Sequence, residues 1–176
     1  PIRLFKMNTV NYIDRSSLLN KTSRFVWLYA QMGYGKTMLM QQHFEKNTDN
    51  TCWIDDKTVS PEHELQHFIK YHDTHNATLY IDNIHLLSNA YSTSLFANLP
   101  TKAKVVISSR SFNPKADTSL SLLNEFQVLD YHQLKLNFTD IIKLLPSHHL
   151  ITAKEVFTLS LGWPLLVSMI CKKLPL

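Results

Sequence analysis

A short glycine-containing segment, placed between an apolar run and an amphipathic run, constrains the fold of this chain most strongly. Residues 24–30 are apolar and rich in aromatic side chains, which predicts a buried strand. Met40 and Phe44 lie four positions apart, as on one face of a helix over about 36–46. Between the two runs lies Gly-Tyr-Gly-Lys-Thr, residues 33–37, which holds two of the three glycines in the chain. Strand, glycine loop, Lys-Thr and helix together form the pattern of a phosphate-binding loop.

The residue types in this loop suit a phosphate chain. Glycine lets backbone N–H groups approach the anion, and the helix that follows presents its N-terminus to the same place. In such loops the lysine, here Lys36, reaches the β- and γ-phosphates, and the hydroxyl of Thr37 binds Mg²⁺. The predicted nucleotide-binding residues of the loop are Gly33, Tyr34, Gly35, Lys36, Thr37 and Met38. Ala30 stands where the pattern has its first glycine, and an ordinary strand–turn–helix connection is the alternative interpretation.

Length and composition are those of a globular protein. The chain has 176 residues, 44% of them hydrophobic and 18% charged, which fits one domain or one domain with a small appendage. No apolar run reaches the length of a membrane span, and no signal peptide precedes the first strand. The net charge of +4 is spread along the chain, so charge alone does not predict DNA contact. Cys52 and Cys171 lie in apolar surroundings and are interpreted as buried thiols in a reducing compartment.

Strands and helices are expected to alternate after the loop. The predicted strands are 24–30, 51–54, 77–82, 103–108 and 126–129. The predicted helices are a short one near 13–19, then 36–46, one beginning at Ser60-Pro61, one over 88–99 and one near 118–124. This alternation predicts a three-layer α/β fold, with a parallel sheet of about five strands between helices.

The pattern becomes purely helical near residue 137. Phe138, Ile141, Ile142 and Leu145 have helical spacing, Thr152 with Glu155 resembles a capping box, and Pro164 follows a turn. We therefore expect a phosphate-loop domain over 1–136 and a small helical appendage over 137–176.

One acidic residue follows an apolar strand at the position where Mg²⁺ would need it. Asp82 ends the run Thr78–Ile81, and ligands of open α/β sheets gather at the carboxyl ends of the strands. We interpret Asp82 as the Mg²⁺-binding acid, with a strand-end cap of the next turn as the alternative. Asn83 stands where many hydrolytic relatives have a second carboxylate, so slow or negligible hydrolysis is expected. Asp55 or Asp56, after the second strand, is the alternative base.

Two further features are candidates for nucleotide contact. Arg110 follows the fourth strand and is placed to bind a γ-phosphate by bidentate hydrogen bonding, unless it is only a surface arginine. Gly162-Trp163-Pro164 contains the third glycine and forms either a wall for a nucleotide base or a simple helix–helix turn.

Taken together, these motifs resemble the MalT-like signal-transduction ATPases, the STAND-class domains of large LuxR-type transcriptional activators. Residues 30–37 resemble the family's A-G-Y-G-K-T loop, and Arg15 with Leu18 and Leu19 resembles its R-x-x-L segment. Residues 52–55 resemble its Trp-containing second strand, residues 81–85 its D-D-x-H motif, residues 107–110 its S-R sensor, and residues 162–164 its G-W-P/A motif.

The resemblance implies that ATP or ADP binds with Mg²⁺ between the sheet and the following helices. It further implies that Arg15 belongs to the nucleotide site, that Pro164 touches the adenine and that Arg110 touches the γ-phosphate. In the family, ADP holds the protein resting, and ATP with an inducer drives self-association and transcription activation. The resemblance also implies a fold in which another strand lies between the strands of Lys36 and Asp82. Asn83 departs from the family's usual aspartate.

The sequence therefore predicts a cytoplasmic ATP/ADP-controlled switch from a transcriptional regulator, with no membrane contact. We expect the chain to be an excised module, in which DNA contact depends on a C-terminal domain that this sequence does not include. A turnover ATPase or kinase is the alternative, although Asn83 argues against it. A third interpretation is a nucleotide-free interaction module. The sequence does not identify the inducer, the DNA target or the oligomeric state.

Overall fold

The structure, a computed structural model, describes residues 13–20, 23–47, 50–72, 77–87, 102–110, 126–145 and 150–173. It divides into two compact units, which are described separately below. One is Arg15–Leu134, and the other contains Lys135–Leu176 together with the first residues of the chain. The helices predicted over 88–99 and near 118–124 lie outside the described residues.

The larger unit contains a five-stranded sheet in which every pair of neighbouring strands is parallel. The strands are β1 Phe25–Tyr29, β2 Thr51–Ile54, β3 Thr78–Ile81, β4 Lys104–Ser109 and β5 Phe126–Leu129. Their order is β2-β3-β4-β1-β5, so β4 lies between β1 and β3. The predicted fold class is confirmed, as is the placement of a strand between those that precede Lys36 and Asp82.

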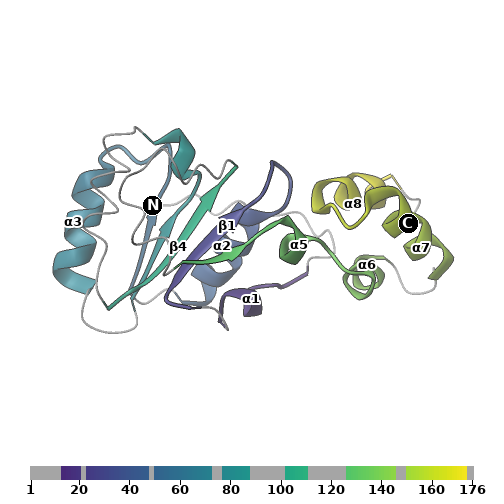
Figure 1. The fold of residues 1–176 in the computed structure, drawn as a ribbon, viewed down its shortest axis with the longest axis horizontal. Helices are drawn as coiled ribbons and strands as arrows, with labels where there is room; N and C mark the ends of the chain where they lie inside the picture. Colours follow the sequence, from purple (N-terminus) through teal and green to yellow (C-terminus); the bar gives the residue numbers. More distant parts are fainter. Residues whose placement is uncertain are drawn as a thin grey trace. The chain divides into compact units, whose positions relative to one another are not determined.

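Helices cover both faces of this sheet (Figure 1). On one face, Leu65 and Phe68 of α3 (Pro61–His72) pack against buried strand residues such as Trp27. On the other face, Leu39 and Met40 of α2 (Lys36–Lys46) pack against the opposite side chains of the same strands. The central strands β1, β3 and β4 are buried on both sides, which explains why they appear in the sequence as continuous apolar runs.

The predicted helices of this unit are found close to their expected positions. Helix α2 has the bounds 36–46 predicted for it, and α3 begins at Pro61, after Ser60. The short helix before β1 is α1, Ser17–Asn20. Two elements were not predicted, the 3₁₀ helix η1 (Ile84–Leu86) and the one-turn helix α5 (Tyr131–Leu134), because single turns are too short to show a helical period.

The smaller unit consists of three helices with their own core. These are α6 Phe138–Leu144, α7 Leu150–Ser160 and α8 Pro164–Cys171. The core contains Leu136, Ile141, Leu145, Ala153, Val156 and Val167. Of the four apolar residues predicted to face inward from α6, Ile141 and Leu145 are buried, whereas Phe138 and Ile142 are about 38% and 37% exposed.

The capping box predicted at Thr152 and Glu155 was wrong, because α7 already begins at Leu150 and Thr152 lies inside it. A capping box does occur at the start of α6. There Asn137 Oδ1 accepts from the Asp140 amide at 2.8 Å, and Asp140 Oδ2 accepts from the Asn137 amide at 3.1 Å. Sequence analysis missed this box because Asn with Asp is a variant of the usual Ser/Thr with Glu/Gln.

The turn between α7 and α8 requires its glycine. Gly162 has φ +78°, and a Cβ there would lie 2.3 Å from the carbonyl oxygen of Leu136. The Leu136 amide donates to the Gly162 carbonyl at 2.8 Å, so the two backbones run against each other. Trp163 is the N-cap of α8 and Pro164 its first residue, a position where proline loses no helical hydrogen bond. The helix–helix turn predicted as one alternative is thus present.

Candidate functional site

The glycine loop joins the carboxyl end of β1 to the first turn of α2. Gly33 and Gly35 have φ angles of +85° and +76°, in the left-handed region that favours glycine. A Cβ on Gly35 would meet nothing within 4 Å, so backbone conformation, and not space, makes glycine necessary there. Ala30, at the position of the missing first glycine, is buried.

Lys36 folds back over this loop. Its side chain is buried, and Nζ donates to the carbonyl oxygens of Ala30 at 2.5 Å and Gln31 at 3.0 Å. Burial lowers the pKa of Lys36, the charge of Asp82 opposes this effect, and Arg110 adds to it. An ammonium group held against its own loop by neutral carbonyl acceptors can exchange them for the stronger, charged acceptor oxygens of a phosphate.

Thr37 and Asp82 meet where the helix and the sheet edge come together. The Thr37 hydroxyl donates to Asp82 Oδ2 at 2.8 Å, and Asp82 is only 4% exposed. A hydroxyl and a carboxylate are hard oxygen donors of the kind that Mg²⁺ prefers. The structure therefore brings together the two residues that the sequence assigned to Mg²⁺, although they lie 45 positions apart.

Ser108 orients the Asp82 carboxylate, a role that sequence analysis did not assign. Its hydroxyl donates to Asp82 Oδ1 and accepts from the backbone amide of Asn83 at 2.9 Å. The Asn83 side-chain amide donates to Asp82 Oδ2 at 3.2 Å. The signal was in the strand register, because pairing of Ile81 with Ile107 places Ser108 beside Asp82. That register was not available before the strand order was known.

Arg110 is exposed and follows β4 directly. Its positive charge lowers the pKa of Lys36 and of His85, in each case after the larger effect of burial, so it shares the electrostatic environment of the loop. The neighbouring Ser109 faces the other way, and its hydroxyl accepts from the indole Nε1 of Trp27 at 2.8 Å. Ser109 is thus engaged with Trp27, whereas the charge of Arg110 acts on Lys36 and His85.

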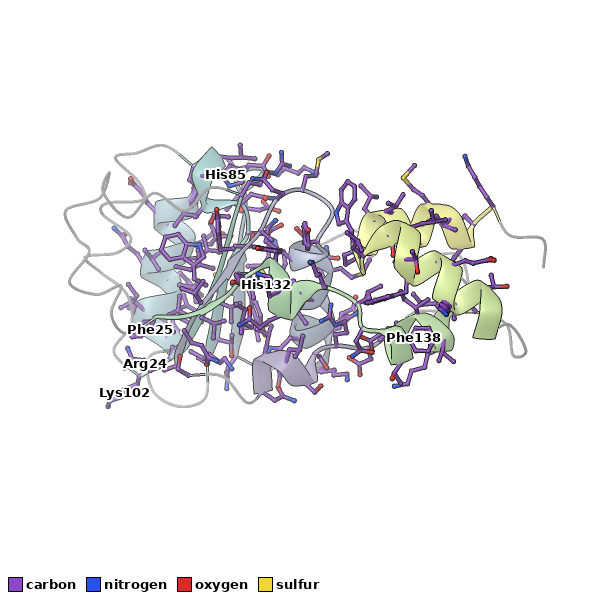
Figure 2. All side chains as sticks on the ribbon, turned by 45° about the vertical axis from the view of Figure 1, so that its right-hand side comes forward. Arg24, Phe25, His85, Lys102, His132 and Phe138 are labelled. Carbon is purple, nitrogen blue, oxygen red and sulfur yellow. The ribbon has the colours of Figure 1, made fainter. Side chains whose placement is uncertain are left out.

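His85 lies in η1 at the same edge of the sheet, as its label in Figure 2 shows, and the residue is half-buried with both ring nitrogens covered. Among the described residues, neither of its ring nitrogens has a hydrogen-bond partner. Burial lowers its pKa, Arg110 and Lys36 lower it further, and Asp82 and Asp56 act in the opposite direction. A buried polar group without a partner is costly, so the unpaired ring nitrogens of His85 destabilise this part of the structure as it stands.

The alternative base, Asp55, is already engaged in a local turn. Its Oδ1 accepts from the Lys57 amide at 3.0 Å and the Thr58 hydroxyl at 3.2 Å. Its Oδ2 accepts from the Trp53 indole at 3.3 Å. These bonds hold the carboxylate close to its own turn.

The remaining predicted site residues have other neighbours. The Arg15 guanidinium donates to the backbone carbonyls of Gln133 and Leu134, each at 2.8 Å, and so attaches α5 to the start of the unit. The Tyr34 ring meets Tyr131 edge-on at 6.2 Å, and Met38 is half-buried in the first turn of α2. Pro164 belongs to the smaller unit. Nucleotide contact by each of these residues stays a prediction.

Both cysteines are half-buried rather than fully buried, and neither forms a disulfide. Burial, with a smaller effect of Glu64, raises the pKa of Cys52 to about 12, which keeps it an inert thiol. None of the described helices is long and apolar enough to cross a membrane.

Comparison with known proteins identifies the fold. No protein-family model matches the sequence, and no curated protein matches it. Among solved structures, a point variant of Thermotoga maritima RuvB matches with a TM-score of 0.55 and 16% identity, over 90% of this chain and 57% of that one. Thermotoga maritima RuvB, described as a Holliday junction branch migration motor, matches with a TM-score of 0.51 and 14% identity, over 90% and 56%. The chain thus spans little more than half the length of these proteins, and at such identities the likeness concerns the fold alone. This chain has the α/β fold of a P-loop NTPase domain.

Proposed function

We propose that this chain is an ATP- or ADP-binding switch module with weak or no intrinsic hydrolysis. The observation that carries the proposal is the 2.8 Å contact between Thr37 and Asp82 beneath a glycine loop whose lysine is folded over it. Lys36 binds the β- and γ-phosphates, Thr37 and Asp82 hold Mg²⁺, and Gly33, Tyr34, Gly35 and Met38 surround the phosphate chain. Mg²⁺, when bound, neutralises phosphate charge and fixes the nucleotide in place.

Arg110 senses the γ-phosphate in this proposal. Its exposed guanidinium lies beside the loop and exerts its charge on Lys36, so an added phosphate group would neutralise an existing repulsion between the two cations. ATP and ADP differ by this phosphate, which gives the module a means of distinguishing them. The resemblance to MalT-like proteins implies that Pro164 touches the adenine and that Arg15 belongs to the nucleotide site.

Asn83 favours slow hydrolysis, and therefore a switch over a turnover enzyme. Its side-chain amide donates to Asp82 and cannot accept a proton from an attacking water, as a general base must. Asp55, one of the two alternative bases, is held in its own turn, and Asp56, the other, is exposed. Slow hydrolysis leaves the bound nucleotide in place long enough to define a state.

The wider role follows from the resemblance and belongs to the same proposal. The chain is the nucleotide-binding module, residues 1–136 with a partial helical lid over 137–176, of a cytoplasmic LuxR-family regulator similar to MalT. ATP favours self-association of the full-length protein, and DNA is contacted only through a C-terminal domain outside this sequence.

Thermal unfolding with ADP–Mg²⁺, with ATP–Mg²⁺ and without nucleotide tests the proposal. A ligand at 100 times its Kd stabilises the folded state by about 2.7 kcal/mol. We expect this stabilisation in the natural chain and its loss in Lys36→Ala. Lys57→Ala removes the same charge from an exposed position and serves as the matched control.

Each outcome has a distinct meaning. A shift that persists in Lys36→Ala would place the nucleotide elsewhere, and no shift with either nucleotide would favour the nucleotide-free interaction module. Steady-state phosphate release well above background would favour a turnover ATPase. A preference for ADP over ATP would support a resting switch.

A further inference from the structure

Two histidines lie one helical turn apart on the outer face of α3. His63 and His67 belong to the segment His-Glu-Leu-Gln-His, residues 63–67, which the sequence analysis passed over. Leu65 and Phe68 of the same helix are buried against the sheet, whereas both histidines are exposed. Side chains four positions apart on a helix have Cβ atoms about 5–6 Å from each other, which is within reach of one shared metal ion.

The two imidazole rings lie close to each other. Their centroids are 6.5 Å apart, and their planes are inclined by 32°. Metal–nitrogen bonds of about 2.0 Å in a tetrahedral site bring two such centroids to roughly 5 Å. Rotation of exposed side chains supplies this small approach without any movement of the backbone.

The surroundings of the pair restrain one ring and leave space beside the other. The ring of Tyr71, one further turn along α3, lies 4.6 Å from that of His67, centroid to centroid, and restricts its rotation. His63 borders a surface cleft of about 510 Å³ at the start of α3, which is also lined by Glu62 and Gln66. The cleft leaves room for the water molecules that complete a coordination sphere.

The spacing of the two histidines is that of the His-Glu-x-x-His motif, but the described residues do not form the site of such a protease. In those enzymes the glutamate is the general base at the metal, and further ligands complete the site. Here Glu64 is exposed, and the described ranges of the structure place no third ligand beside the two histidines. In the part of the chain that the structure describes, no group of three or more His, Cys, Asp or Glu side chains could hold a metal.

We propose that His63 and His67 form a two-histidine chelate for a divalent transition-metal ion, Zn²⁺, Ni²⁺ or Cu²⁺, on the exposed face of α3. Water fills the remaining coordination positions. Imidazole nitrogen selects these borderline ions, whereas the oxygen ligands Thr37 and Asp82 select Mg²⁺. The site is therefore chemically distinct from the nucleotide site and independent of the proposed function.

Equilibrium dialysis of the tag-free chain against each metal ion tests the proposal, with Mg²⁺ in excess to occupy oxygen-ligand sites. We expect one strongest site per chain, with Cu²⁺ bound more tightly than Ni²⁺ or Zn²⁺. Two ligands on one helix bind a metal ion more tightly than one ligand does, because the second bond forms within the same complex. His63→Gln and His67→Gln each remove one ligand and should therefore weaken binding by roughly 10²-fold. His132→Gln, which removes another exposed histidine, is the matched control and should leave the strongest site unchanged.

Broadening of imidazole NMR signals by substoichiometric Cu²⁺ provides a second readout, and it should affect His63 and His67 first. Circular dichroism of the variants checks that α3 still forms. We expect it to form, because both substituted positions are exposed. Undiminished binding in both single variants would overturn the proposal. Absence of a strongest site, or first broadening of other histidines, would overturn it as well.

Discussion

His43, in α2, is buried in a hydrogen-bonded network behind the phosphate loop, and this network should make folding depend on pH. Its Nε2 lies 2.9 Å from Asn20 Oδ1, which can only accept, so Nε2 carries the proton. The Tyr80 hydroxyl, fully buried in β3, then donates to Nδ1 at 2.5 Å. The neutral imidazole satisfies both partners, and a second proton, on Nδ1, would prevent the Tyr80 hydroxyl from donating to that nitrogen.

The magnitude follows from the pKa of His43. Burial first, then the charges of Lys104 and Lys46, lowers this pKa from 6.5 to about 4. The unfolded chain therefore binds a proton at this histidine below pH 6.5, while the folded chain stays neutral until about pH 4. At about 1.4 kcal/mol per pH unit, the free energy of unfolding should fall by about 3 kcal/mol as the pH is lowered from 6.5 to about 4. Above pH 6.5, His43 should contribute no pH dependence.

Urea unfolding at several pH values between 4 and 7.5 measures this effect, with tryptophan fluorescence as the signal. Trp27 and Trp53 lie in the same unit as His43. His43→Gln removes the titrating group, so the advantage of the natural chain over this variant should shrink by about 3 kcal/mol as the pH falls from 7 to 4. Tyr80→Phe removes the hydrogen bond but keeps the buried histidine, and it should keep most of the pH dependence.

Two results would refute this reasoning. Parallel curves for the natural chain and His43→Gln would show that His43 does not titrate differently in the folded state. Loss of the pH dependence in Tyr80→Phe would show that the hydrogen bond, and not burial, lowers the pKa.

Three further substitutions test other parts of the structure. Gly162→Ala would place a Cβ 2.3 Å from the Leu136 oxygen, at a φ of +78°. We expect the free energy of unfolding of the smaller unit to fall by at least about 2 kcal/mol, measured by thermal unfolding followed by circular dichroism. An unchanged midpoint would contradict the close approach. Asn137→Ala removes the cap on the Asp140 amide and should cost about 1 kcal/mol in the same measurement, whereas Asn137→Ser should restore most of it. Asn83→Asp supplies a second carboxylate at a φ of +54° that aspartate tolerates, and phosphate release from ATP should rise by about 10²-fold or more. No increase would mean that Asn83 does not limit hydrolysis.

Local sequence patterns predicted most elements of the larger unit. The bounds of α2 and β2 were predicted to the residue, because a glycine loop, a polar turn or a change of periodicity marks each end. The start of α7 was misplaced because Thr152 and Glu155 have capping-box spacing but lie inside a helix. Spacing alone does not show whether a residue begins a helix or continues one.

The residues of the candidate site that carry chemistry were predictable from the sequence, but the residues that position them were not. Lys36, Thr37 and Asp82 were identified because each belongs to a short motif with a known chemical purpose. Ser108, which orients Asp82, and His85, whose ring nitrogens are buried, lie within the motifs at residues 107–110 and 81–85, but those motifs alone assigned no role to either residue. The hydrogen bonds of the Arg15 guanidinium to the carbonyls of α5, more than 100 positions away, also had no signal in the sequence, and nucleotide contact by Arg15 stays a prediction.

The sequence by itself determined which residues form strands, helices and the phosphate loop, since these depend on neighbours within one or two turns. The tertiary structure decided the strand order β2-β3-β4-β1-β5 and, with it, which side chains meet at the sheet edge. Insertion of β4 between β1 and β3 places Ser108 against Asp82, and packing of α2 on the sheet places Thr37 there. These contacts join residues that are distant in the chain, and they form only when burial of both faces of the sheet outweighs the entropy of ordering the chain between them.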